Sequence, residues 1–102
     1  MIHVIAFITA HPGKRAALLA EFRKIIPLVH AEAGCIEYGP AVDTEGMGGF
    51  QTKFGPDTFV VMEKWESPAA LKAHAAAPHM KDYGARAKDL IAGRVIHVLS
   101  PA

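Results

Sequence analysis

Two histidines in the last third of the chain are the first candidates for chemistry. His74 and His79 bound the segment "HAAAPH", and Glu63 and Trp65 precede them in "MEKWES". An unperturbed imidazole titrates close to neutral pH, so it can serve as an acid, a base or a metal ligand. A spacing of five residues across Pro78 does not place both rings on one helical face, as a spacing of four would. The pair by itself leaves metal binding, acid–base catalysis and a purely structural role open.

Metal binding is the weakest of these interpretations. A zinc site would need a third ligand from Glu63, Asp43 or another element, and no spacing points to one. The only cysteine is Cys35, which excludes an internal disulfide and a Cys-rich metal site. The sequence also lacks a Gly-rich phosphate loop, a dinucleotide fingerprint, an HExxH motif and a GxSxG elbow. We therefore predict neither a metal site nor a bound cofactor.

The surroundings of His74 favour a pocket. Glu63 and Trp65 share one face of a predicted strand, because strand side chains alternate between faces. That strand leads directly into the predicted helix of His74, so a carboxylate, an aromatic ring and an imidazole can meet at the mouth of one pocket. A structural role remains the alternative for Trp65 and for both tyrosines. The phenol of Tyr38 on the second predicted strand, or of Tyr83 on the last predicted helix, could also reach such a pocket and bind a ligand.

The elements that must position these residues follow from hydrophobic periodicity and from turn residues. They are a strand at 2–10, a helix at 14–32, strands at 35–43 and 57–66, a short helix from 67, a second helical stretch from about 79 to 91 and a strand at 94–100. This order predicts a single α+β domain over residues 1–102. Its expected architecture is a ferredoxin-like βαββαβ protomer with a four-stranded antiparallel sheet.

The strands carry apolar residues on both faces, yet two helices cover only one face of a sheet. In the third strand, Phe59, Val61 and Trp65 alternate with Val60 and Met62. An uncovered apolar face of this size is unusual in a soluble monomer. We therefore predict a homodimer joined sheet to sheet.

Composition excludes several partners. There are 11 Lys and Arg against 10 Asp and Glu, so the chain has no basic surplus for binding nucleic acid. The apolar stretches are strand-sized, and no signal-peptide pattern is present, so we expect no membrane span and a cytoplasmic protein. The Gly-rich segment 44–56 also contains Met47, Phe50 and Phe54; it either covers a pocket or rests on the domain's own core.

Three stretches of the chain carry a family resemblance. They are "VIAFITAHPGK" at the start, "IIPLV" followed by "EAGCIEY" in the middle, and "VVMEKWES" followed by L, H and "PHMKDY". With these the chain resembles the antibiotic biosynthesis monooxygenase family, and especially its quinol monooxygenase branch. The resemblance implies a ferredoxin-like protomer that forms a dimeric α+β barrel.

The resemblance also implies a chemistry, namely oxidation of quinol-like or hydroxyaromatic small molecules by dioxygen without metal or flavin. On this interpretation His74 is the base, His79 is the second choice, and Glu63 orients an imidazole. Trp65 stacks on the ring or lines the pocket together with Phe59, Met62 and Met80. A haem-degrading branch of the family uses an asparagine on the first strand. This chain has "VIAFI" there and no asparagine, which argues against haem degradation. The alternatives are a non-oxidative isomerase or hydrolase and a small-molecule-binding dimer that uses the same pocket.

Overall fold

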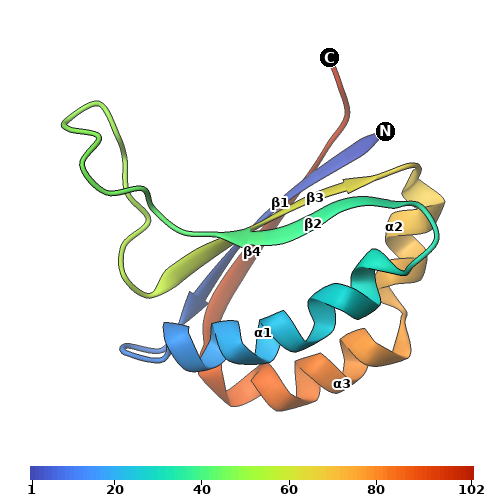
Figure 1. The fold of residues 1–102 in the computed structure, drawn as a ribbon, viewed down its shortest axis with the longest axis horizontal. Coiled ribbons are helices and arrows are strands. Elements are labelled where there is room, and N and C mark those ends of the chain that lie inside the picture. Colours follow the sequence, from blue (N-terminus) through green and yellow to red (C-terminus); the bar gives the residue numbers. More distant parts are fainter.

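The computed structural model describes residues 1–102 as a four-stranded antiparallel sheet with all of its helices on one side (Figure 1). The strand order is β2-β3-β1-β4, which confirms the predicted ferredoxin-like α+β protomer. The elements along the chain are β1 (Ile2–Ala10), α1 (Arg15–His30), β2 (Cys35–Ala41), β3 (Thr58–Trp65), α2 (Pro68–Ala75), α3 (Pro78–Ala87), a short 3-10 turn (Lys88–Leu90) and β4 (Ile91–Leu99).

Helix α1 buries one apolar stripe against the sheet. Its fully buried residues Leu18, Phe22, Ile25 and Val29 recur every three or four positions, which is the helical period. Pro27 lies inside the helix, and the helix ends at His30 rather than at Glu32. The chain then turns through Gly34, whose φ is +82°. A Cβ at Gly34 would lie 2.6 Å from that of Ala70, so glycine permits the close approach of α2 to this turn.

Helices α2 and α3 both begin at a proline. Ser67 caps α2, since its hydroxyl accepts a hydrogen bond from the Ala70 N–H at 3.1 Å, and Pro68 occupies the first helical position as predicted. Pro78 does the same for α3. The helical prediction to residue 91 was too long, and the last strand begins three residues earlier than predicted. The reason is that Ile91 pairs with Ala10 of β1, so the first residues of "IAGR" belong to strand β4 and not to the helix.

The sheet separates a covered face from an open one. The covered face carries the core, in which Val4, Ala6 and Ile8 of β1 meet Phe59, Val61 and Trp65 of β3 beneath α1.

None of the helices combines the length and the apolar character that crossing a membrane requires.

The open face is apolar and partly exposed. Met62, Val95 and Leu99 keep about half of their surface in solvent, at 47%, 51% and 47%. The loop between β2 and β3 projects beyond the sheet edge (Figure 1), and the Phe54 ring returns to pack on Phe7 with ring centroids 4.8 Å apart. The loop thus rests partly on its own sheet, while Phe50 remains 82% exposed at its tip.

Candidate active site

A cavity of about 790 Å³ lies between the covered face of the sheet and helices α2 and α3. Its floor is the apolar face of β1, β3 and β4, and its walls come from α1, α2 and α3. The predicted residues that line it are Tyr38, Glu63, His74, Met80 and Tyr83. Ligand pockets typically have volumes of roughly 300–1,000 Å³, so this one can hold a small aromatic molecule.

Glu32 joins the two histidines at one end of this cavity. Its carboxylate accepts a hydrogen bond from His74 Nδ1 at 2.9 Å and from His79 Nε2 at 2.7 Å. The side chains of Glu32 and His74 are only 14% and 7% exposed, so both bonds lie largely out of solvent. Helix α3 thereby brings His79 close to His74 in space, although their sequence spacing does not.

The bond to Glu32 determines which ring nitrogen of His74 is free. A carboxylate accepts hydrogen bonds, so Nδ1 of His74 carries the proton that it donates, and Nε2 of the neutral ring holds a lone pair. Nε2 makes no hydrogen bond within the chain, and it is not among the enclosed polar atoms. Because His74 lines the cavity, its Nε2 is available to a ligand there.

Trp65 and Glu63 form the wall behind His74. The Trp65 indole N–H donates to Glu63 Oε1 at 2.8 Å, and the indole packs on the His74 ring with centroids 4.6 Å apart. Trp65 is fully buried and does not line the cavity itself. Burial raises the pKa of Glu63, while the hydrogen bond from Trp65, and the positive charge of His74 when its ring is protonated, oppose that rise.

Two tyrosines supply hydroxyl groups to the cavity. Burial, and then the nearby Glu63 carboxylate, raise the pKa of Tyr38 well above its ordinary value, so its hydroxyl remains protonated. Burial raises the pKa of Tyr83 to about 12, although the positive charges of Arg94 and Arg86 act against this. Neither hydroxyl has a hydrogen-bond partner within the chain, and neither is enclosed, so both are free to donate to a ligand.

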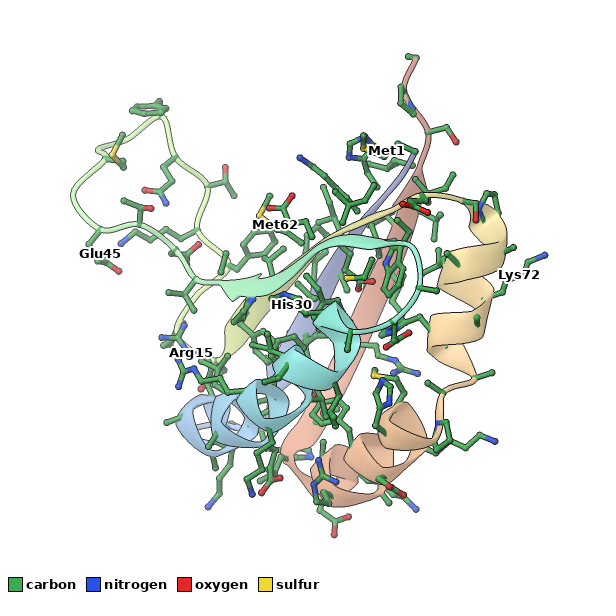
Figure 2. The ribbon with its side chains drawn as sticks, turned by 45° about the vertical axis from the view of Figure 1, so that its right-hand side comes forward. Met1, Arg15, His30, Glu45, Met62 and Lys72 are labelled. Carbon is green, nitrogen blue, oxygen red and sulfur yellow. The ribbon has the colours of Figure 1, made fainter.

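Four predicted site residues lie outside the cavity lining. Phe59 is fully buried and packs edge to face on Phe22 in the core, Trp65 stands behind Glu63, and His79 reaches the site only through Glu32. The prediction that Met62 lines the pocket beside Phe59 was wrong. Consecutive strand residues point to opposite faces, so Met62 lies on the open face, on the side of the sheet away from α1 (Figure 2).

Glu32 is the site residue that the sequence interpretation did not identify. It lies two residues beyond the end of α1, within the quoted stretch "EAGCIEY", and 42 positions before His74. A signal was present in the single acidic residue of "HAEAG", but nothing in its spacing indicates a histidine partner. No group of three or more His, Cys, Asp or Glu side chains is arranged to hold a metal ion.

Comparison with known proteins places this geometry in a family. The sequence profile described as antibiotic biosynthesis monooxygenase matches residues 1–86. The chain belongs to the antibiotic biosynthesis monooxygenase family. The match ends within α3, so it includes β1, β3 and both histidines of the site. The family name supports a monooxygenase activity.

Individual relatives match the chain over nearly its whole length. A protein of Escherichia coli described as a probable quinol monooxygenase, YgiN, is 43% identical over 99% of this chain and 98% of its own length. The crystal structure of PA3566 from Pseudomonas aeruginosa (29% identity, TM-score 0.81) superposes on 99% of this chain and 93% of its own. The structure of Rv0793 from Mycobacterium tuberculosis (28% identity, TM-score 0.80) superposes on 99% of this chain and 94% of its own.

Proposed function

We propose that this chain is a cofactor-independent monooxygenase that oxidises quinol-like hydroxyaromatic molecules with dioxygen in the cavity beside His74. Membership of the antibiotic biosynthesis monooxygenase family and the 43% identity to a probable quinol monooxygenase support the reaction class. The observation that carries the proposal is that His74 lines an apolar cavity while its Nδ1 is bonded to Glu32, which leaves Nε2 as the nitrogen without a partner.

The reaction balances without an external reductant. A quinol and dioxygen give a hydroxyquinone and water, so one oxygen atom enters the ring and the other leaves as water. The substrate supplies all four electrons: two as quinol becomes quinone, and two as a ring C–H becomes C–OH. The reaction begins when the quinol loses a proton and its anion transfers one electron to dioxygen, and recombination of the two radicals forms the new C–O bond.

His74 takes that first proton. Transfer from a free phenol to a free imidazole costs about 5 kcal/mol, given ordinary pKa values near ~10 and ~6.5. The Glu32 carboxylate stabilises the imidazolium that forms, and the protonated hydroxyl of Tyr38 can donate to the developing oxyanion. The apolar floor excludes water, which strengthens both interactions.

Glu32 is a positioning residue in this scheme, because it acts through His74. By accepting from Nδ1 it keeps the proton on that nitrogen and leaves Nε2 as the base. By accepting from His79 as well, it ties the end of α2 to the start of α3. Both N–H groups donate to the same oxygen, Oε2, so a single oxygen of Glu32 holds both rings.

The first test is oxygen consumption with menadiol-like quinols, corrected for autoxidation in enzyme-free buffer. We expect His74→Gln to lower kcat by roughly 100-fold or more, since positioned acid–base groups contribute 10²–10⁴-fold. His11→Gln is the matched control, because His11 is exposed and makes no side-chain hydrogen bond. Equal rates in the wild type and His74→Gln would contradict the assignment of His74 as the base. Turnover that persists without oxygen would contradict the oxygenase and favour an isomerase.

A second test isolates the role of Glu32. In Glu32→Gln the amide oxygen can still accept, but it no longer carries the charge that supports two N–H donors. We expect kcat to fall by about 10-fold with a smaller change in KM, and ¹⁵N spectra of labelled histidine to show loss of the single Nδ1–H tautomer of His74. An unchanged tautomer together with a lowered kcat would contradict the positioning role.

We also propose that the protein acts as a homodimer joined through the open faces of two sheets. The support is the row of half-exposed apolar side chains on β3 and β4, including Met62, Val95 and Leu99. Burying such a face against a copy of itself removes apolar area from water and satisfies the symmetry of a two-fold interface.

A further inference from the structure

The end of the cavity away from His74 is positively charged. Three cations line the cavity, Lys81, Lys88 and Arg94, against a single carboxylate, Glu63. None of the three cations takes part in an ion pair, whereas the neighbouring Arg86, which does not line the cavity, pairs with Glu21 at 3.0 Å. The whole chain has a formal charge of only +1, so this concentration of positive charge is local.

Two of these cations lie far from the base. In the register of the sheet, Glu63 is opposite Val4 of β1, while Arg94 is opposite Ile8, four residues further along the same strand. At roughly 3.3 Å per residue this separates Arg94 from the Glu63 end by about 13 Å. Lys88 lies in the short turn that leads into β4, so it stands near the same end as Arg94.

Tyr83 lines the same cavity as Arg94 and supplies a hydroxyl group to it. Burial raises the pKa of the Tyr83 hydroxyl, and the positive charges of Arg94 and Arg86 act against that rise. A ligand that extends from His74 toward Arg94 would therefore meet a hydroxyl donor and a guanidinium together. Guanidinium with a neighbouring donor binds carboxylates well, because its N–H groups match the two oxygens.

We propose that the hydroxyaromatic ligand of this cavity carries an acidic substituent, a carboxylate, at the end opposite its reacting hydroxyl, and that Arg94 and Lys88 bind it. The reacting hydroxyl then lies at His74 and the ring over the apolar floor of Val4, Ala6 and Ile8. This inference rests on the proposed function for the orientation of the hydroxyl. It adds the chemical class of the substituent and the residues that select it.

Binding of two matched, redox-inert ligands tests the inference without turnover. The ligands are 6-hydroxy-2-naphthoate and its neutral amide, 6-hydroxy-2-naphthamide, which share one ring system and differ in charge. Isothermal titration calorimetry at low salt should give a Kd at least about tenfold lower for the naphthoate, the lower end of the effect of a hydrogen bond to a charged group. The preference should shrink as salt screens the charges.

Variants assign the preference to its residues. Arg94→Gln and Lys88→Gln should each reduce it, with Arg94→Gln bringing the two affinities to near equality. Arg23→Gln, an exposed arginine on α1 without an ion pair, is the matched control and should retain the preference. Circular dichroism verifies that each variant is folded before titration.

The outcomes separate this inference from the proposed function. Equal affinity of the wild type for both ligands, or a preference that survives in Arg94→Gln, would overturn the anion site and leave the oxygenase proposal standing. Failure of both ligands to bind at millimolar concentration would overturn both. A naphthoate preference in a protein that consumes no oxygen would retain the anion site and overturn the oxygenase.

Discussion

The two faces of the sheet use the same strands for different purposes. On β3, Glu63 and Trp65 point to the helices, where they are buried and joined by a hydrogen bond, while Met62 before them and Lys64 between them point the other way. The covered face holds polar groups that need fixed partners, because an unpaired buried polar group is costly. The open face holds apolar groups that need only to be removed from water. One strand can therefore contribute to the cavity on one face and present an apolar surface on the other.

The largest expected effect comes from Trp65, which supports the covered face. Trp65→Ala should lower the free energy of unfolding by about 3–5 kcal/mol through lost packing and the resulting cavity. The measurement is urea unfolding at several protein concentrations. Met62→Ala on the open face is the comparison: its effect should depend on protein concentration, since it weakens only the association. If both variants lost the same free energy of unfolding at every protein concentration, the two faces would not differ in the way proposed.

A charge on the open face should separate the proposed dimer. Val95→Glu places a carboxylate in the middle of the apolar face, and burial of an unpaired charge there would weaken association on the order of 100-fold. Sedimentation velocity at micromolar concentration measures this. Leu28→Glu, on the exposed side of α1, should leave the sedimentation coefficient unchanged. A monomeric wild type would contradict the proposed dimer interface on the open face.

The covered face should also show a characteristic pH dependence through Glu63. Because burial raises its pKa in the folded protein, the proton is bound more tightly in the folded state, and stability falls as pH rises through that value. Glu63→Gln should therefore be more stable than the wild type at pH 8, and the difference should vanish below the ordinary carboxyl value of 4.5. Urea midpoints across pH measure it, and a difference that does not change with pH would contradict it.

The smallest expected effect concerns the cap that starts α2, the helix of His74. Ser67→Ala removes the acceptor for the Ala70 N–H and should cost about 1 kcal/mol of stability. Ser67→Asp, which can still accept that bond, should recover most of it. Thermal unfolding of the three proteins is sufficient, and equal melting temperatures for Ser67→Ala and the wild type would show that the cap is not needed.

Local pattern determined much of the fold. Alternation placed Glu63 and Trp65 on one face, and the structure joins them by a hydrogen bond; Ser67 and Pro68 marked the start of α2 because a capping hydroxyl and a proline act within one turn. The same alternation should have kept Met62 apart from Phe59. The start of β4 was misplaced because pairing with β1, which involves residues some eighty positions away, decides it.

The sequence by itself determined the elements, their order and the side chains that could do chemistry. Only the tertiary structure decided which of those side chains meet. His74, His79 and Glu32 come from α2, α3 and the turn after α1, and their hydrogen bonds span 42 and 47 residues. Likewise, Arg94 reaches the cavity through the register of β4 on β1. Short-range periodicity encodes the face on which a residue lies, whereas contacts between distant segments depend on how whole elements pack, and no local spacing records that.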